Sequence, residues 1–274
     1  MMIQGIAELV GKYKLFLIDL YGVIHDGINH FEKAAEVVNY LRDGGKKVIF
    51  FSNTPRPKED VAQKLAGMSS KLKDFEIVTS GEFFKYTLHY PEKYDLDFLS
   101  HYAFPLSNNL NHPLLTIPNL KITNSVETAS YLLIIASVEN KADLSMFDRI
   151  LEQAAKRNLP CICPNPDLVA HQGKDIIYTA GSFALRYKEL GGNVYYMGKP
   201  ENNFYKFALD NNNIITQYVL AVGDNLYTDI KGANDFGLDS LFVKNGVCDK
   251  DDINTLMDNT GLKPTYIIND FKLK

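Results

Sequence analysis

Short apolar runs of about four residues alternate with longer amphipathic segments along most of this sequence. The first run, residues 15–18, leads directly into Asp19, and so short a run closed by a turn predicts a buried parallel strand. Residues 31–42 carry apolar side chains at helical spacing and end before a pair of glycines, and another apolar run follows at residues 48–51. Strand, helix and strand in this order predict a parallel crossover unit.

The same alternation continues to residue 89, loses its periodicity in a loop-rich stretch at residues 91–124, and then resumes as a second series. Further helices are predicted at residues 57–66, 81–89, 144–157, 181–190, 203–209 and 229–236. Further strands are predicted at residues 76–79, 131–138, 159–163, 193–197, 218–222 and 240–243, before a weaker helix and strand. Because strand 193–197 resembles the first series, we expect a doubly wound parallel α/β core of residues 1–86 and 192–274, interrupted by an inserted α/β domain at residues 87–191.

The composition is that of an ordinary globular protein, with 46% apolar and 23% charged residues. A formal net charge of −4 argues against nucleic acid or an acidic membrane as the main partner. The most apolar interior run, residues 131–138, is far shorter than the roughly 20 residues that span a bilayer. Since the first residues also lack the apolar core of a signal peptide, we expect a cytoplasmic protein. Its three cysteines, Cys161, Cys163 and Cys248, are too few for a zinc tetrad, and we expect them to be reduced and partly buried.

Polar side chains stand at the carboxyl ends of four predicted strands, which is where open α/β sheets bind their ligands. They are Asp19, Ser52 with Asn53, Lys199, and Asp224, with Asp229 shortly after it. If these strands are neighbours, the set suits phosphoryl transfer. A carboxylate can attack phosphorus, while a lysine, small polar donors and Mg²⁺ neutralise the transferring group.

Each of these residues also has a simpler structural interpretation. Asp19 could cap a turn, Asp229 could cap its helix, and Lys199 could be a solvated loop residue. The segment GDNLYTDI, residues 223–230, is the hardest to explain in this way, because two carboxylates flank a strand-to-helix turn. His25 could line the mouth of the site, but a position in a surface turn is the simpler expectation.

Taken in order, these motifs resemble the haloacid dehalogenase superfamily, in its class IIA (NagD-like) branch of capped phosphatases. DLYGV at residues 19–23, SNT at 52–54, GKP at 198–200 and GDNLYTDI are similar to the four motifs of that superfamily. The inserted domain lies between the second and third motifs, as the branch requires, and NPD at residues 165–167 is similar to its cap motif. The resemblance covers nearly the whole chain and implies a Rossmann-like core with an inserted cap.

The resemblance also implies a function and a role for each residue. We expect a Mg²⁺-dependent phosphomonoesterase that acts on small phosphorylated metabolites, sugar phosphates among them, through an aspartyl-phosphate. The resemblance implies that Asp19 is the nucleophile, that Ser52 and Asn53 bind the phosphoryl group, and that Lys199 orients it. It implies that Mg²⁺ is bound by Asp19, Asp224 and the backbone carbonyl of Tyr21, with Asp229 either a further ligand or a residue beside the ion. Arg56 and Asp167 are weaker candidates for contact with the substrate. The resemblance also suggests a second copy of the chain as a partner, in a homodimer formed through the cap.

The chain departs from the family pattern at Tyr21, where phosphatases of the superfamily carry a second Asp that protonates the leaving group. A tyrosine can donate a proton but is a poor base near neutrality, and general acid–base catalysis contributes roughly 10²- to 10⁴-fold. Tyr21 therefore predicts a slow phosphatase or one selective for activated leaving groups. Two alternatives remain: a dehalogenase that displaces halide from a 2-haloacid with Asp19, and a phosphate-binding protein without turnover.

Overall fold

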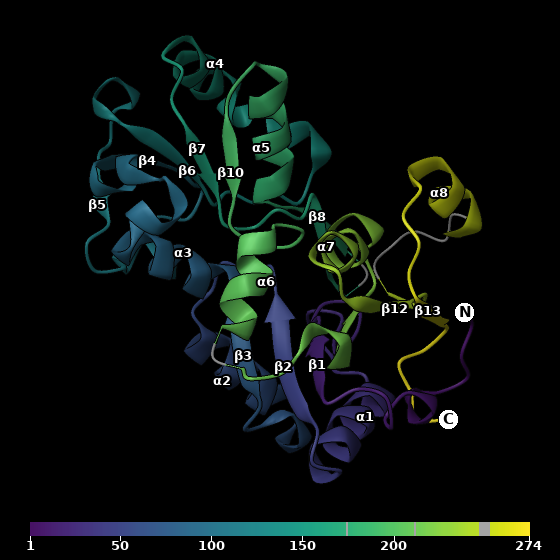
Figure 1. The fold of residues 1–274 in the computed structure, drawn as a ribbon. Helices are drawn as coiled ribbons and strands as arrows, with labels where there is room; N and C mark the ends of the chain where they lie inside the picture. The colour runs from purple at the N-terminus through teal and green to yellow at the C-terminus, as the bar shows by residue number, and fades with distance from the viewer. Residues whose placement is uncertain (174, 211, 247–252) are drawn as a thin grey trace.

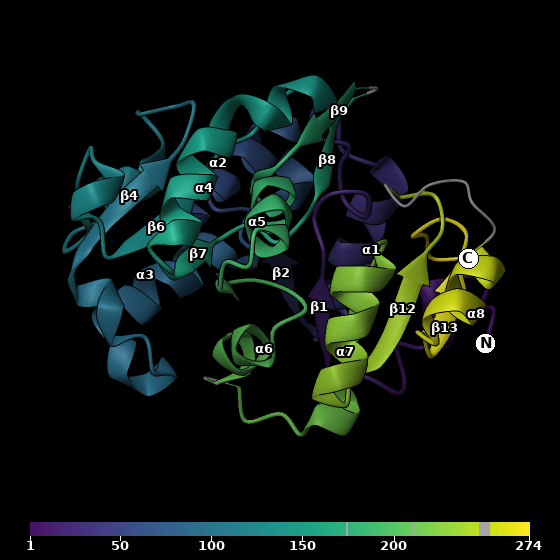
Figure 2. The ribbon, with the colours of Figure 1, turned by 90° about the horizontal axis from the view of Figure 1, so that it is seen from above.

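The computed structural model describes residues 1–173, 175–210, 212–246 and 253–274, which form two lobes, each built around a parallel sheet (Figures 1 and 2). In the first lobe, six of the described strands pair in the order β13-β12-β11-β1-β2-β3, and every adjacent pair is parallel. They are β1 (Leu15–Ile18), β2 (Lys47–Ser52), β3 (Glu76–Thr79), β11 (Val219–Gly223), β12 (Asp239–Val243) and β13 (Tyr266–Ile268).

Helices cover both faces of this sheet, because alternate side chains of a buried strand point to opposite faces. On β1, Phe16 and Ile18 pack in one cluster with side chains of α1 and α2, whereas Leu15 and Leu17 pack in another with α3, α6 and α7. The helices of this lobe are α1 (Glu32–Asp43), α2 (Lys58–Met68), α3 (Ser80–His89), α6 (Asn202–Leu209), α7 (Lys231–Phe236) and α8 (Ile253–Thr260). The predicted doubly wound parallel core is thus confirmed.

The second lobe holds five parallel strands in the order β10-β7-β6-β4-β5 and a separate antiparallel hairpin, β8–β9. Its elements are β4 (Tyr102–Leu106), β5 (Lys121–Ile122), β6 (Tyr131–Ile134), α4 (Asp148–Lys156), β7 (Cys161–Cys163), β8 (Val169–Gln172), β9 (Asp175–Tyr178), α5 (Ala180–Glu189) and β10 (Val194–Tyr196). Leu132 and Ile134 of β6 pack with α4 and α5, whereas Tyr131 and Leu133 belong to the cluster that contains Leu15 and Leu17. The two lobes therefore share apolar packing.

Short 3-10 turns connect the elements of both lobes. They lie at Ile6–Glu8, Ser70–Leu72, Pro91–Tyr94, Asp97–Ser100, Pro113–Thr116, Val126–Thr128, Lys141–Phe147 and Thr216–Tyr218. None of the helices within the described ranges is long and apolar enough to cross a membrane. Cys161 and Cys163 are buried, free thiols on β7, and Cys248 lies outside the described residues.

The strand expected at residues 193–197 belongs to a different sheet from the one predicted. It is β10, and it pairs in parallel with β7 through Val194 and Cys161 in the second lobe. Its apolar pattern suits a buried strand of either sheet, so the sequence alone could not distinguish the two positions. We therefore propose that the chain returns to the first lobe after Tyr196 and not at residue 192.

The stretch at residues 91–124 is more regular than expected, because it contains β4 and β5. Pro105 obscured β4, since a proline within an apolar run argues against a central strand. The carbonyl of Ala103 faces β5, where it accepts a bond from Thr123 N at 2.9 Å, and the nitrogen of Pro105, two residues on, faces the same side. Because β5 pairs only with Tyr102 and Ala103, Pro105 interrupts no bond of that ladder.

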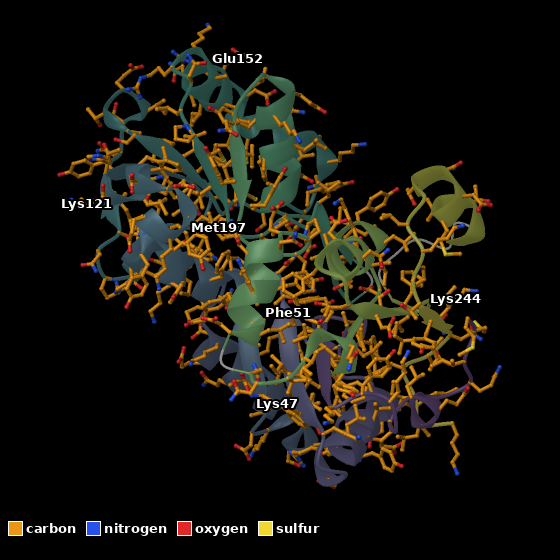
Figure 3. All side chains as sticks on the ribbon, in the orientation of Figure 1. Lys47, Phe51, Lys121, Glu152, Met197 and Lys244 are labelled. Atoms are coloured by element: carbon orange, nitrogen blue, oxygen red, sulfur yellow. The ribbon has the colours of Figure 1, made fainter. Side chains whose placement is uncertain are left out.

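The direction of the strands decides where a site can form. Figure 3 shows β2 rising from Lys47, at the far end of the first lobe, to Phe51, which lies toward the junction with the second lobe near Met197. All strands of the first sheet are parallel, so their carboxyl ends share this junction. The second lobe therefore covers the edge at which the polar strand ends were predicted to converge.

Candidate active site

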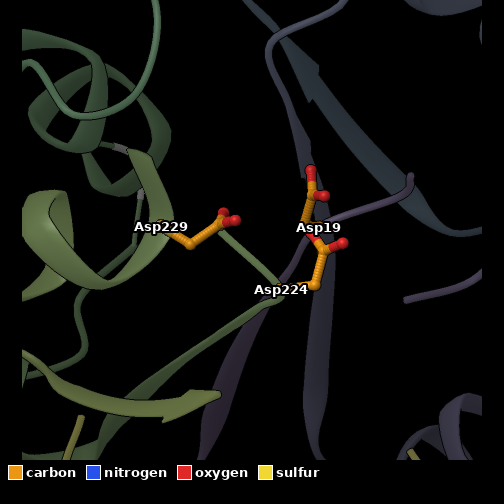
Figure 4. A group of neighbouring side chains, drawn as sticks. All are labelled: Asp19, Asp224 and Asp229. Carbon is orange, nitrogen blue, oxygen red and sulfur yellow. The ribbon is translucent and has the colours of Figure 1, made fainter. Parts of the chain in front are cut away.

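Three buried aspartates meet at the carboxyl ends of the two central strands (Figure 4). Asp19 follows β1, and Asp224 follows β11, which is hydrogen-bonded to β1 through Asp19 N and Val222 O at 2.9 Å. Asp229 returns to the same point from a single π-helical turn, Leu226–Ile230. One oxygen of each carboxylate lies within 4.8 Å of the others.

Two local features bring the Asp229 carboxylate into this position. A Cβ at Gly223 would lie 2.0 Å from Asp229 Cγ, so only glycine leaves room for it. The backbone N–H of Asn225 then donates to Asp229 Oδ2 at 3.2 Å. The alternative in which Asp229 caps the helix is wrong, because Asn225 Oδ1 accepts from Tyr227 N at 2.9 Å and caps this turn.

Lys199 supplies a buried cation between two of these carboxylates. Its Nζ lies 2.6 Å from Asp19 Oδ1, 2.7 Å from Asp229 Oδ1 and 3.0 Å from the carbonyl oxygen of Phe51, and the residue is 2% exposed. Burial lowers the pKa of this ammonium group, but Asp19, Asp229 and Asp167 together raise it above its ordinary value. Lys199 is therefore a charged, fixed group and not the solvated loop residue of the simpler interpretation.

The charges in this cluster do not balance. Burial, together with Asp229 and Asp167, raises the pKa of Asp19 to about 7 against the opposing effect of Lys199. Three carboxylates facing one ammonium leave an excess of negative charge with oxygen donors a few ångströms apart. Hard divalent cations take oxygen ligands of this kind, so the donor set fits such an ion.

Ser52 and Asn53, at the end of β2, have different surroundings. Ser52 lines the central cavity, and its Oγ accepts from Thr54 N at 3.3 Å. The side chain of Asn53 is occupied by the protein: Nδ2 donates to Asp167 Oδ1 at 2.9 Å and to Lys199 O at 3.2 Å, and Oδ1 accepts from Lys199 N at 2.7 Å. The Asn53 amide therefore joins Lys199 and Asp167, a role that the sequence motif did not indicate.

A cavity of about 350 Å³ lies between the two lobes, with the acidic cluster at one end. Residues of both lobes line it, including Asp19, Asp224 and Lys199 from the predicted site and Asn108, His112 and Ser137 from the second lobe. The latter three were missed by sequence reasoning. Asn108 and His112 lie in the stretch without periodicity, and no motif marked any of the three.

His112 presents a defined neutral imidazole at the cavity. Its Nδ1 accepts from Leu114 N at 3.2 Å, which leaves the proton on Nε2 as a donor. Burial and the nearby Arg56 lower its pKa to about 4 against the opposing effect of Asp60. Arg56 also lines the cavity, and its side chain is 53% exposed and lies 3.9 Å from Asp60 Oδ2. Both side chains are therefore available to a ligand in the cavity.

Tyr21 lies at the cavity, but its hydroxyl group has a partner elsewhere. Lys64 Nζ, on α2, donates to the Tyr21 oxygen at 3.1 Å, and the Tyr21 ring packs edge-on against His25 at a centroid distance of 4.4 Å. His25 is 1% exposed, so its expected position in a surface turn is wrong. Its Nδ1 accepts from Gly27 N at 3.0 Å, and burial lowers its pKa to about 3.

Comparisons with known proteins agree with this arrangement. A family model described as haloacid dehalogenase-like hydrolase matches residues 16–97, and one described as HAD-hydrolase-like matches residues 196–273. An acid sugar phosphatase of Staphylococcus haemolyticus is 26% identical over 266 residues, which are 96% of this chain and 95% of that protein.

Two solved structures have the same fold over almost the whole chain. A haloacid dehalogenase-like hydrolase from Brucella suis is 27% identical with a TM-score of 0.80, and the match covers 98% of this chain and 100% of that one. A protein described as a possible sugar phosphatase of the HAD superfamily from Cytophaga hutchinsonii is 24% identical with a TM-score of 0.82, and the match covers 100% and 99% of the two chains. The second likeness speaks for the fold alone.

Proposed function

Because the chain belongs to the haloacid dehalogenase superfamily, in its class IIA (NagD-like) branch of phosphatases, we propose that it hydrolyses small phosphorylated metabolites through an aspartyl-phosphate on Asp19. The observation that carries this proposal is the buried cluster in which Lys199 contacts Asp19 and Asp229 beside the cavity between the lobes. A nucleophile, a cation and further carboxylates at one point are what phosphoryl transfer needs.

In this reaction Asp19 and Lys199 have separate tasks. Lys199 Nζ holds Asp19 Oδ1, so Oδ2 is the oxygen that attacks phosphorus. The same ammonium, together with Ser52 on the cavity wall, neutralises and orients the phosphoryl oxygens. The side-chain amide of Asn53 holds the main chain of Lys199 in place, so we assign a positioning role to the Asn53 side chain.

The acidic cluster is the proposed Mg²⁺ site. Asp19, Asp224 and the backbone carbonyl of Tyr21 would hold the ion, which when bound supplies positive charge to the transferring phosphoryl group. Both oxygens of Asp229 already have protein partners, Lys199 Nζ on Oδ1 and Asn225 N on Oδ2. We therefore assign to Asp229 the task of holding Lys199 and the turn, beside the ion.

The substrate class follows from the cavity. Its volume of about 350 Å³ suits a small phosphorylated metabolite, and Arg56, His112 and Asn108 offer hydrogen-bond donors to a polar leaving group. Sugar phosphates fit this description, which agrees with the acid sugar phosphatase relative.

The proposal is tested with 4-nitrophenyl phosphate and Mg²⁺. We expect turnover by the native chain, a fall to background in Asp19→Asn, and loss of activity when a chelator removes the ion. Asp43→Asn makes the same change on a side chain that is 72% exposed on α1, and it should retain native turnover. Release of halide from a 2-haloacid without added metal would instead identify a dehalogenase, and bound phosphate without turnover would identify a binding protein.

A further inference from the structure

The proposed reaction lacks a carboxyl group at the position where the family pattern carries its second Asp. Tyr21 stands there, and its hydroxyl oxygen accepts a hydrogen bond from Lys64 Nζ on α2. Expulsion of an alkoxide needs a proton, and hydrolysis of an aspartyl-phosphate needs a base to activate water. A second carboxyl group that faces the cavity would supply both.

Asp167 of the second lobe is placed to be that group. It lies in the turn after β7 and lines the same cavity as Asp19 and Lys199. Two close approaches fix this turn: a Cβ at Gly198 would lie 2.9 Å from Pro166 Cδ, and a Cβ at Gly181 would lie 2.3 Å from the carbonyl oxygen of Asp167. Gly198 lets the turn lie close to the first lobe, and Gly181 lets the turn pack against α5 of its own lobe.

One oxygen of the Asp167 carboxyl group is bonded to the protein, and the other is available to a ligand. Asn53 Nδ2 donates to Asp167 Oδ1 at 2.9 Å, and the Thr179 hydroxyl donates to its backbone carbonyl. Within the described parts of the chain, no second hydrogen bond to this carboxyl group is found, which leaves Oδ2 for a ligand in the cavity. The same Asn53 amide holds Lys199, so the position of Asp167 is tied to that of the phosphoryl-binding lysine.

The charges around Asp167 allow it to exist in both protonation states. Burial, with a smaller contribution from Asp229, raises its pKa to about 6 against the opposing effects of Lys199 and the Asn53 amide. Asp19 also interacts with it electrostatically. A group with a pKa close to neutrality serves well both as an acid and as a base.

We propose that Asp167 is the general acid and base of this phosphatase, an inference that rests on the proposed function. Asp19 Oδ2 forms a bond to phosphorus while the bond from phosphorus to the leaving oxygen breaks, and that oxygen takes the proton of Asp167. The Asp167 carboxylate then accepts a proton from water, whose oxygen attacks phosphorus. The bond to Asp19 breaks, and inorganic phosphate leaves with both aspartates restored.

The test compares Asp167→Asn with the native chain on two substrates. Asparagine keeps an oxygen that can accept from Asn53 Nδ2, so the turn should keep its shape. With glycerol 2-phosphate, an alkyl ester, kcat/KM should fall roughly 10²- to 10⁴-fold. With 4-nitrophenyl phosphate, whose leaving group departs unprotonated, kcat/KM should stay within about tenfold, because formation of the aspartyl-phosphate needs no acid.

A second readout follows the base. In Asp167→Asn the hydrolysis of the aspartyl-phosphate should become limiting, so 4-nitrophenyl phosphate should give a burst of about one equivalent of nitrophenol followed by slow turnover. Asp175→Asn, the same change on an exposed side chain of β9 in the same lobe, should match the native chain on both substrates.

Equal losses on both substrates without a burst, or no loss on either, would overturn the assignment of Asp167. Failure of the proposed function gives a different result, because the native chain would then not hydrolyse 4-nitrophenyl phosphate at all.

Discussion

His25 illustrates how one residue near a site can govern stability without taking part in the chemistry. It is buried beneath the Tyr21 ring, and its Nδ1 accepts from Gly27 N. Burial and the nearby ammonium group of Lys64 lower its pKa to about 3 against the opposing effect of Asp26. The folded protein therefore keeps this imidazole neutral at a pH where the unfolded chain would protonate it.

This difference predicts a pH dependence of unfolding. Between about pH 6.5 and 3 the unfolded chain binds a proton on His25 that the folded protein does not, so stability falls as the pH drops, by up to about 4 kcal/mol. His25→Asn keeps an acceptor near Gly27 N and cannot titrate. Its free energy of unfolding in urea should depend less steeply on pH over that range.

The matched control changes an exposed histidine. His101→Asn should keep the native dependence on pH, because His101 is solvated in both states. His112, whose pKa burial also lowers, contributes equally to all three proteins, so the difference between variants isolates His25. Parallel curves for His25→Asn and the native chain would contradict the prediction.

For single residues, the sequence indicated which ones lie at the site more reliably than it indicated which partners their side chains bind. Asp19 and Asp224 meet as expected, because the carboxyl ends of the adjacent parallel strands β1 and β11 share an edge. Lys199 reaches Asp19 for another reason, since it follows β10 of the second sheet and its main chain is held by the Asn53 amide. The commitment of the Asn53 amide to Lys199 and Asp167 depends on a contact across 146 residues of sequence, which no local pattern encodes.

Among the elements, those with strong periodicity were predicted well. Helix α1 at Glu32–Asp43 lies within one residue of the expected range, because its buried Ala34, Val38 and Leu41 repeat at helical spacing. The strand expected at residues 131–138 ends at Ile134, although the apolar run continues. Hairpin β8–β9 was not predicted, because its two strands have only four residues each and show no regular alternation of apolar and polar residues.

That hairpin also provides a prediction at the scale of the element. Gly173, at its turn, has a φ of +65°, and its N–H donates to the carbonyl oxygen of Asp26 in the first lobe at 3.0 Å. A Cβ there would lie 2.9 Å from Ile28 Cδ1. Gly173→Ala should therefore weaken this contact between lobes, raise KM several-fold and leave kcat/KM lower, as measured by steady-state kinetics.

Gly191→Ala is the matched control for this change. Gly191 has a φ of +86° in the same lobe, but no atom lies within 4 Å of its added Cβ among its described neighbours. Both variants should lose about 1–2 kcal/mol from strain in the left-handed region. Only Gly173→Ala should change KM, and an equal change in both would show that the hairpin contact does not affect substrate binding.

For the whole molecule, the unbalanced acidic cluster predicts a coupling between ion binding and stability. The carboxylates of Asp19, Asp224 and Asp229 are assembled only in the folded protein, so Mg²⁺ should bind that state in preference. At a hundredfold excess over Kd this contributes about 2.7 kcal/mol, or roughly 5–10 °C in Tm. Thermal unfolding in Mg²⁺ and in chelator measures it.

Asp224→Asn should remove most of that rise in Tm, because it takes away one proposed ligand. Asp239→Asn is the control. It changes a partly exposed carboxylate at the start of β12, where Asp239 pairs with Lys12, and it should preserve the response to Mg²⁺. An identical Tm of the native chain with and without Mg²⁺ would contradict this assignment of the ion site.

The position of Asp167 on the second lobe has a consequence for how such a protein can diverge. The proposed nucleophile and the acidic cluster belong to the first lobe, whereas the proposed proton donor comes from the second lobe, which also supplies Asn108 and His112 to the cavity wall. Exchange of that lobe between related chains would transfer both the choice of leaving group and the means of protonating it. New specificities could then be inherited as a module, without rebuilding the half of the site that handles phosphorus.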